Sequence, residues 1–573
     1  MSTPFYDLAS LVVVPSGYKS GKIYAQKPLT TDGQLTFSRS TAASRVASNG
    51  LIEKVRSNLL LQSNSFNTTW TAFNATLTSG QAGYDGTNNA WELTSSANGG
   101  NIAQNNTQSG LQTFSVYAKG SVSNGIRVYT FGGVNANAYF NLNLGTVVAV
   151  NGSGATAKIE SVGGGWYRCS ITFNQTNVSL RFYPSDNGTT MVAGTVYIQE
   201  AQLESGDIAT EPILTTTAAV SVGPVANVPR LDYLGATCGP RLNLEPQRTN
   251  LVLYSEQFDN AGWNKSASSV TANNGVSPDG YTNADLITSS GAAGYVFPSS
   301  INVFASAGGA TYTYSVYLKA GTASTITVLI AATANYRGIF DLSAVTATTN
   351  TANTTPSIVS VGNGWYRCAI VCTSVASTAY SELQIGRVAS GLNFLAYGAQ
   401  LEAGAYPTSY IPTLGAAVTR GADACSKQNI AGTLPTEYPF TLYAQGFLRE
   451  NNDVLLSIND YNQAEVYYQI GATAAGFFAN ARNATESKIQ TSSGRNVGTH
   501  KVAAVFTSSE IRLFANGALI ATGANGQTFN ANANDVLLGQ LRVSSDLGQR
   551  SSVNQALVFK SALSDADAIA LTA

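Results

Sequence analysis

The sequence predicts an all-β protein made of β-sandwiches, two of which are copies of a single jelly-roll domain. Short runs of alternating apolar and polar residues, separated by clusters of Gly, Asn and Asp, are typical of strands joined by tight turns. A long block that begins at Arg56 begins again at Arg248. Helical periodicity is almost absent, except after Ser564-Asp565-Ala566-Asp567, which has the pattern of a helix start.

The duplication rests on four matched segments that keep their order. Arg56–Phe66 returns as Arg248–Phe258, Thr113–Lys119 as Thr313–Lys319, Ile159–Ile171 as Ile358–Ile370 (identical at 10 of 13 positions), and Ala201–Gly206 as Ala399–Gly404. The period is much longer than that of solenoid repeats, so we expect two domains in series. Their strands fit a jelly roll of roughly eight to ten strands.

The remaining segments divide the chain into five parts. We expect a leader over residues 1–55, a first repeat over 56–217, a Pro- and Gly-rich connector over 218–247, a second repeat over 248–425, and a different all-β domain over 426–573.

Composition excludes several classes of function. Only 11% of the 573 residues are charged and the net charge is −1, so no basic surface for nucleic acid is expected. The sequence has no apolar run of about 18 residues that would span a membrane, and its N-terminus lacks the basic start of a signal peptide. The five cysteines are scattered, which favours reduced, buried thiols and synthesis in a reducing cytoplasm.

The repeated segments resemble the jelly-roll modules of tailed-bacteriophage fibres. The pattern is most complete as Arg248–Phe258, Ser315–Lys319, Asn363–Cys368 and Ala399–Thr413. The resemblance extends to other parts of the chain. Phe37–Ala42, Asn49–Ile52, Pro229–Tyr233 and Leu244–Leu251 resemble lead-in segments of phage tail-fibre and head-fibre proteins, and Ser10–Lys27 resembles the leader of virion surface proteins, including those of crAss-like phages. Residues 426–573 are similar to the concanavalin A-like, laminin-G-type sandwich.

This resemblance implies a structural protein of the virion surface: a head fibre, collar or tail appendage, made in the host-cell cytoplasm. Phage fibres imply a homotrimer by analogy. The leader would be an extended anchor that docks on another virion protein, such as a capsid, portal or tail protein, by strand addition or an apolar plug. The anchor candidates are Phe5, Tyr6, Leu8, Leu11, Val12, Val13 and Val14.

Host-surface or mucosal glycans are the expected ligands, because jelly rolls and laminin-G-type sandwiches often bind sugars with exposed aromatic rings beside amide and carboxylate groups. The candidate residues are Tyr461, Tyr467, Tyr468, Asn459, Asp460 and Asn462. Side chains alternate along a strand, so at least one of these tyrosines is expected to pack inward. Trp166 and Trp365 recur with their whole strand and are expected in the core, whereas Trp70 and Trp263 could face a cleft.

Catalysis and cofactors are not expected. His500 is the only histidine, and no G-x-S-x-G elbow marks a nucleophile. No zinc site is predicted, because the Cys residues and the single His are scattered. A glycan depolymerase would need a carboxylate pair, for which Asp453, Asp460 and Glu465 are the candidates in the last domain. A bacterial carbohydrate-binding protein without catalysis is the other alternative, although it would require export.

Three further acidic features are interpreted as structural. Asp85-Gly86 and Asp279-Gly280 favour plain turns over calcium loops. Glu204 and Glu402 are expected to orient strand ends. The first repeat departs from the second after Glu204, at Asp207–Pro212, so its closing turn is expected to pack differently.

Overall fold

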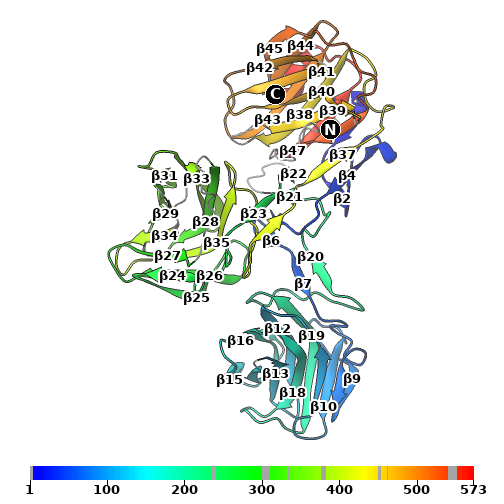
Figure 1. The fold of residues 1–573 in the computed structure, drawn as a ribbon. Coiled ribbons are helices and arrows are strands. Elements are labelled where there is room, and N and C mark those ends of the chain that lie inside the picture. The colour runs from blue at the N-terminus through cyan, green and yellow to red at the C-terminus, as the bar shows by residue number, and fades with distance from the viewer. Residues whose placement is uncertain are drawn as a thin grey trace. The chain divides into compact units, whose positions relative to one another are not determined.

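The computed structural model confirms an all-β protein built from antiparallel sandwiches (Figure 1). It describes residues 4–133, 135–233, 240–299, 310–332, 334–375, 382–448, 453–460, 462–483, 485–539 and 551–573. These residues form two compact units: Val55–Gly223, and Met1–Lys54 together with Pro224–Ala573. Among the described residues, no helix is long and apolar enough to cross a membrane.

The first repeat is a sandwich of two six-stranded sheets. One sheet has the order β16 (Thr156–Gly163), β17 (Trp166–Asn174), β12 (Leu111–Gly120), β19 (Gly194–Ser205), β10 (Ala90–Ser95) and β9 (Ala75–Gln81). The other has the order β15 (Thr146–Asn151), β14 (Ala136–Asn141), β13 (Gly125–Gly132), β18 (Asn177–Ser185), β11 (Asn101–Asn105) and β8 (Thr71–Phe73). A short pair, β7 (Arg56–Asn58) and β20 (Val220–Val222), joins the two ends of the unit.

The second repeat has the same strand order, which confirms the duplication in three dimensions. Its first sheet is β32 (Thr354–Gly362), β33 (Trp365–Val375), β28 (Ala310–Ala320), β35 (Asn393–Ala403), β26 (Thr282–Ser289) and β25 (Ser268–Val276). Its second is β31 (Thr346–Thr348), β30 (Asn335–Asp341), β29 (Thr325–Ala331), β34 (Glu382–Val388), β27 (Gly294–Pro298) and β24 (Trp263–Ser266). The pair β23 (Arg248–Asn250) and β36 (Val418–Arg420) corresponds to β7 and β20.

The third sandwich is assembled from three separate parts of the chain. One sheet runs β21 (Leu231–Asp232), β22 (Arg241–Leu244), β47 (Ser551–Phe559), β38 (Phe440–Leu448), β43 (Gly498–Phe506), β44 (Glu510–Ala515) and β45 (Ala518–Ala524), with β1 (Leu11–Val13) also paired to β47. The other runs β2 (Gly17–Lys19), β3 (Lys22–Tyr24), β4 (Gln34–Ser38), β37 (Ala424–Lys427), β46 (Asp535–Leu538), β39 (Asp453–Asp460), β40 (Gln463–Ala472), β41 (Phe477–Asn483) and β42 (Thr485–Gln490).

The remaining elements are short. They are α1 (Pro4–Leu8), the 3-10 turn η1 (Thr31–Gly33), the hairpin β5 (Ser44–Val46) and β6 (Ile52–Lys54), and α2 (Asp565–Thr572). The helix predicted near the C-terminus is confirmed: the backbone N–H of Asp567 donates to Ser564 Oγ over 3.2 Å, which caps α2.

The leader and the connector therefore differ from the prediction, which treated them as separate segments. Their strands complete the sheets of the third sandwich, so the two jelly rolls are insertions into that domain. Short strands of three to five residues carry little periodic signal, and their partners lie hundreds of residues away, as with Leu11 opposite Val558. Sequence proximity consequently gave the wrong grouping.

The anchor prediction needs the same correction. Leu11, Val12 and Val13 are buried in the third sandwich, and their backbone groups pair with β47. Phe5, Tyr6 and Val14 are partly buried against the same core, and Tyr6 Oη accepts a hydrogen bond from Gln555. Only Leu8, which is 62% exposed, projects outward. Strand addition does occur, but onto this chain's own sheet, so β1 is not available to a second protein.

Three of the lead-in segments meet the end of the second repeat in a buried cluster of charges. Arg39, Arg230, Glu245, Arg420 and Asp423 have side chains that are at most 1% exposed. Arg39 lies 3.0 Å from Asp423, Arg230 lies 2.9 Å from Glu245, and Arg230 also pairs with Asp423. Burial lowers the pKa of Arg39 to about 10, against the opposing charge of Asp423. The cluster ties together the points where the chain leaves and re-enters the third sandwich.

A buried asparagine explains one recurring motif in each jelly roll. Asn250 Nδ2 donates to the carbonyls of Ala399 (3.1 Å) and Ile411 (2.8 Å), and its Oδ1 accepts from the N–H groups of Val252 and Leu401 (both 3.1 Å). Asn58 makes the equivalent four bonds in the first repeat. Each amide thereby uses its full hydrogen-bonding capacity to join three chain segments.

The closing turns of the two repeats are alike despite their different sequences. The Thr210 N–H donates to Glu204 over 2.9 Å, and the Thr408 N–H donates to Glu402 over the same distance. The predicted role of the two glutamates is confirmed, whereas the predicted difference between the turns is wrong at this contact. The donor lies six positions after the acceptor in both copies, so the same turn can close.

Candidate functional site

An open groove lies on the outer face of one sheet of the first repeat. On β13, the side chains of Ile126 and Val128 are fully buried in the core, so strand alternation turns Arg127, Tyr129 and Phe131 outward. The neighbouring strand adds Arg181 and Tyr183 by the same alternation, and β8 adds Phe73 at one end. We call Phe73, Arg127, Tyr129, Phe131, Arg181 and Tyr183 the arginine–aromatic groove.

Stacking between the arginines and the rings organises this groove. The guanidinium carbon of Arg127 lies 4.4 Å from the ring centre of Tyr129, 5.2 Å from Tyr139 and 5.3 Å from Tyr183. Arg181 lies 5.5 Å from the ring of Phe131. Cation–π contacts of this length hold long side chains in place while leaving guanidinium edges available for hydrogen bonds.

Size and exposure suit a small ligand. The cavity volume is about 540 Å³, within the range of roughly 300–1,000 Å³ found for ligand pockets. Phe73 is 62% exposed and Phe131 is 40% exposed, so both can offer a ring face. Burial raises the pKa of Tyr129 above its usual value near 10.

The second repeat provides a comparison within the same molecule. The two copies can be aligned by their strand pairs. Gly125 pairs with Asn141 in the first repeat, and Thr325 pairs with Asp341 in the second. The residues that correspond to Arg127, Tyr129 and Phe131 are therefore, in order, Thr327, Leu329 and Ala331. The pairing of β13 with β18 in the first repeat matches that of β29 with β34 in the second. It makes Gly386 the counterpart of Tyr183, and Gln384 the counterpart of Arg181. The core is kept in both copies, but the groove residues are not. The fold therefore does not require them.

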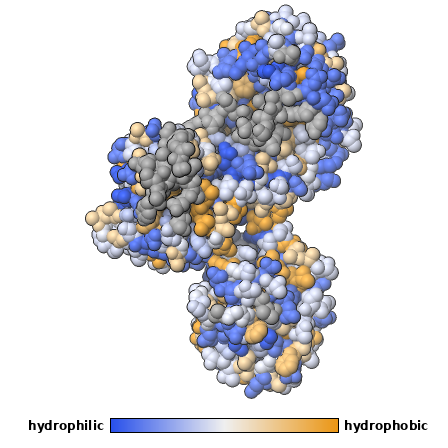
Figure 2. Space-filling view, in the orientation of Figure 1, coloured by the Kyte–Doolittle hydropathy of each residue, from blue (hydrophilic) through white to orange (hydrophobic). Residues whose placement is uncertain are grey.

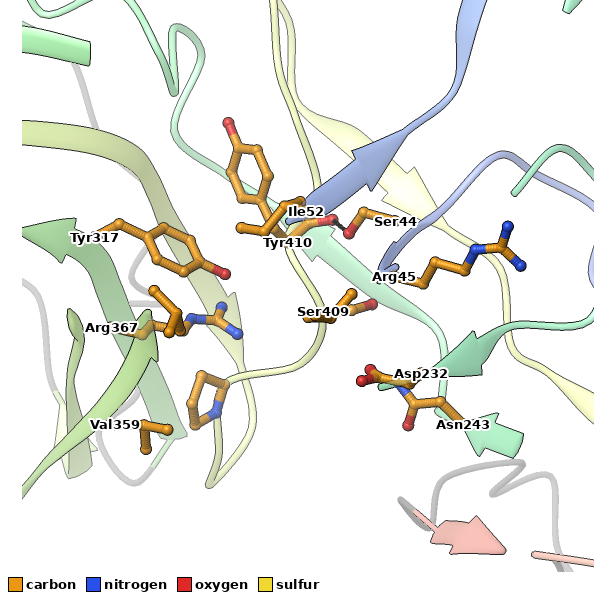
Figure 3. Close-up of a pocket in the computed structure, with 13 residues that line it drawn as sticks. Ser44, Arg45, Ile52, Asp232, Asn243, Tyr317, Val359, Arg367, Ser409 and Tyr410 are labelled. Carbon is orange, nitrogen blue, oxygen red and sulfur yellow. Dashed lines mark hydrogen bonds between the residues drawn. The ribbon is translucent and has the colours of Figure 1, made fainter. Parts of the chain in front are cut away.

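A second hollow lies within the larger unit, where the hairpin β5–β6, the β21–β22 pair and the second repeat meet (Figure 3). Figure 3 shows Tyr317 and Arg367 on one side, Arg45 and Asp232 on the other, and Ser409 between them. Its volume is only about 90 Å³, which is room for a few water molecules. Both arginines are already engaged, Arg45 with Glu53 at 2.7 Å and Arg367 with the Thr408 carbonyl at 2.6 Å. This hollow is a packing junction.

The predicted glycan cluster of the third sandwich is only partly accessible. Tyr468 is fully buried and its Oη accepts from the Asn530 N–H, so at least one tyrosine of the cluster packs inward, as expected. Asn459, Asp460 and Tyr467 are also buried, with Tyr467 Oη donating to Glu486 over 3.3 Å. Asn462 is exposed, whereas Tyr461 lies outside the described residues. The cluster presents little surface to a sugar, and glycan contact there stays a prediction.

The residues considered for catalysis are engaged in structural contacts. His500 is buried, with Nε2 2.8 Å from the Asn496 carbonyl and Nδ1 2.8 Å from the Asn516 amide. Asp453 and Asp460 occupy opposite ends of β39, seven residues and roughly 23 Å apart at the usual strand rise. Glycosidase carboxylates lie within about 10 Å of each other. Glu465 is ion-paired with Arg482.

Two other expectations concern the tryptophans and the Asp-Gly turns. Trp70, Trp166, Trp263 and Trp365 are all buried, so the possibility that Trp70 or Trp263 faces a cleft is wrong. Gly86 and Gly280 have positive φ angles of 79° and 89°, as turns after an aspartate require. In the described part of the chain, no three His, Cys, Asp or Glu residues are grouped to hold a metal ion.

Sequence reasoning missed the groove because it searched for residues that the two repeats share. The available signal was the opposite one: Arg-x-Tyr occurs at Arg127–Tyr129 and again at Arg181–Tyr183, in strands whose second copies lack it. A comparison of outward positions between copies would have identified these residues.

No family model and no curated protein matches the chain. Solved structures that match include the CBM40 of the Ruminococcus gnavus IT-sialidase bound to α2,3-sialyllactose, with 23% identity over 24% of this chain and 84% of that one, at a TM-score of 0.22. The leech intramolecular trans-sialidase matches with 20% identity, 24% and 23% coverage, and a TM-score of 0.21. The binding domain of botulinum neurotoxin serotype G matches with 9% identity, 26% and 40% coverage, and a TM-score of 0.22. Matches at these TM-scores identify neither a family nor a ligand for this chain.

Proposed function

We propose that this chain is a structural protein of the surface of a tailed-phage particle, and that it binds glycans through the arginine–aromatic groove of the first repeat. The groove is the observation that carries the binding function. The virion role is supported by the repeated fibre-type segments, such as Asn363–Cys368 and Ala399–Thr413, and by the lead-in segments that form the buried charge cluster.

The chemistry of the groove suits a sugar. Exposed rings such as those of Phe73 and Phe131 can stack on the apolar face of a pyranose. Guanidinium edges of Arg127 and Arg181, with the hydroxyl of Tyr183, supply donors for ring hydroxyls. A shallow site of this kind binds weakly, and many copies on one particle would raise the avidity.

The low charge of the chain fits an adhesive surface protein. In Figure 2, much of the visible surface is pale, the colour of residues of intermediate hydropathy. Such a surface suits broad contact with other copies, and we propose a homotrimer, as in phage fibres. Light scattering of the full-length protein on a sizing column tests this: the mass of three chains is expected, and a monomer would contradict the trimer without touching glycan binding.

A bacterial carbohydrate-binding protein is the second candidate, since the groove would serve it equally well. Immunogold labelling of purified particles of the phage that encodes the protein separates the two. Label on the particle surface supports the virion role, and particles without label contradict it. A depolymerase is disfavoured, because Asp453 and Asp460 are too far apart to act as an acid–base pair and Glu465 is ion-paired with Arg482.

A glycan array with the full-length protein tests binding. The variant Tyr129→Leu places the second repeat's residue on the same scaffold, so it should fold and lose most of the signal. Tyr295→Leu removes an aromatic ring from the equivalent face of the second repeat and is expected to retain the signal. Equal binding by all three proteins would place the site elsewhere, and binding by none would contradict glycan recognition.

A further inference from the structure

We propose that the arginine–aromatic groove selects acidic glycans, with Arg127 and Arg181 holding the carboxylate of a uronic or sialic acid. This inference rests on the proposed glycan-binding function and specifies its ligand class. None of the groove-lining residues is acidic, so its two arginines give it a charge of +2 in a chain whose net charge is −1.

Among the described residues, neither cation has an acidic partner. The described partners of Arg127 are the Asn137 amide oxygen at 3.4 Å and the Met191 sulfur at 3.1 Å. Those of Arg181 are Ser179 Oγ at 3.2 Å and the Tyr183 hydroxyl at 3.4 Å. All four partners are neutral. Elsewhere in the same unit, Arg56 and Lys158 are paired with glutamates.

Their spacing suits one shared anion. Arg127 stands opposite Tyr183 and Arg181 stands opposite Tyr129, so the arginines are diagonal neighbours on adjacent strands. Diagonal positions lie roughly 7–8 Å apart, close enough for two long side chains to converge on a single carboxylate. The planar guanidinium forms paired hydrogen bonds with a carboxylate, and the flanking rings can hold the sugar that carries it.

The second repeat shows that arginine at these two positions is dispensable for folding. Thr327 and Gln384 stand at the positions of the two arginines, and the same face carries its own arginines elsewhere, Arg337 opposite Leu329 and Arg387 over the ring of Tyr295. Two like charges that are not needed for the fold, placed side by side on an aromatic face, indicate selection for a ligand of opposite charge. Nucleic acid is disfavoured as that ligand, because binding to its phosphate backbone usually involves a larger number of cationic side chains.

Calorimetry with matched probes tests the charge. Oligogalacturonate and its methyl ester differ only in the carboxylate, and 3′-sialyllactose and lactose differ only in the sialic acid. We expect at least one acidic probe to bind about tenfold or more tightly than its neutral match, and to weaken as salt is raised from 50 to 500 mM. Binding of oligogalacturonate would identify a uronate as the ligand, and binding of 3′-sialyllactose would identify a sialate.

Two variants link this selectivity to the arginines. Arg127→Thr and Arg181→Gln carry the second repeat's residues and should each lower affinity for the acidic probe about tenfold, with neutral probes unaffected. Lys158→Gln removes a cation from the exposed ion pair on β16 and should change nothing. Thermal unfolding of each variant verifies that it folds.

The outcomes separate the two proposals. Equal affinity for an acid and its neutral match, or retention of acidic binding by Arg127→Thr and Arg181→Gln, overturns acidic selectivity and leaves glycan binding standing. No binding to any probe, together with a blank glycan array, overturns the function as well. Binding of a single-stranded oligonucleotide in place of every glycan overturns both.

Discussion

The ammonium group of Lys54 lies 2.8 Å from Asp279 Oδ2 and 2.8 Å from Glu256 Oε1, and the Tyr397 hydroxyl lies 2.9 Å away. Lys54 ends strand β6 of the N-terminal segment, whereas its partners belong to the second repeat. Ile52, two residues earlier, is buried against Tyr317 and Trp365 of the same repeat. Tyr117 is the counterpart of Tyr317 in the first repeat. The ring of Tyr84 stacks on it with the ring centres 4.0 Å apart, so the first repeat covers this tyrosine with a residue of its own.

Replacing Lys54 should destabilise the second repeat selectively. Lys54→Met leaves Asp279, whose side chain is 1% exposed, without its cation, and breaking a buried ion pair costs about 3–5 kcal/mol. Hydrogen exchange followed by mass spectrometry should show faster exchange in peptides of β26 and β35, with the first repeat unchanged. Lys22→Met, which removes a lysine bonded to the neutral Gln34, is the matched control.

The defect of Lys54→Met should shrink in acid. Burial alone would raise the pKa of Asp279, but the charge and hydrogen bond of Lys54 outweigh it and lower that pKa. In the wild type, this carboxylate therefore contributes stability above its unfolded pKa of about 3.9, and the contribution is lost as the pH falls through the lower folded pKa. In the variant, burial raises the pKa, so protonation relieves the penalty. Urea unfolding at pH 7 and pH 4 should show the two proteins converging; a constant or growing difference would contradict this account.

The buried asparagines should be among the most sensitive polar positions. Asn250→Ala removes four hydrogen bonds and leaves two carbonyls and two N–H groups without a partner, at a cost of about 2–4 kcal/mol. Asn58→Ala should do the same to the first repeat. Tryptophan fluorescence during urea unfolding measures both, because the five tryptophans lie in the two repeats. The exposed Asn105→Ala is the control, and equal midpoints for all three variants would contradict the role given to these amides.

The N-terminal strand should be essential to the third sandwich. Val13→Asp buries an unpaired carboxylate at a fully buried position and should destabilise the domain by more than about 3 kcal/mol. Limited proteolysis should then cleave within residues 426–573. Leu8→Asp changes a residue that is 62% exposed and should leave the digestion pattern unchanged. If Val13→Asp resists protease as the wild type does, the segment is detachable after all.

The described cysteines should be unreactive in the folded protein. Cys169, Cys368, Cys372 and Cys425 are free and buried, and burial raises the pKa of Cys372 to about 12. The thiolate is the reactive form, so a thiol reagent at pH 8 should label these residues only after urea is added. Cys238 lies outside the described residues and is replaced by Ser in the test. Rapid labelling without urea would show that one of the sandwiches opens readily.

Periodicity and internal similarity were sufficient to predict the β-strand character of the repeats, the duplication and part of the core. Strand alternation is local, so Phe114, Val116 and Cys169 could be placed in a core before their partners were known. The expectation that at least one tyrosine of the candidate cluster packs inward followed the same rule, and Tyr468 is fully buried. The position of the groove did not follow, because its two arginines come from strands about 54 residues apart that only the sheet order brings together.

The sequence by itself determined that this protein is a set of β-sandwiches with one domain duplicated, because side-chain alternation and repetition are properties of the chain alone. Only the tertiary structure decided which strands share a sheet. Backbone hydrogen bonds between strands carry no sequence label, so the pairing of Leu11 with Val558 and of Tyr129 with Arg181 depends on the packing of the whole domain. Because of that packing, part of the predicted anchor lies in a buried strand. The same packing brings the two arginines of the groove together on one face of the first repeat, and the second repeat has no arginine at the matching positions.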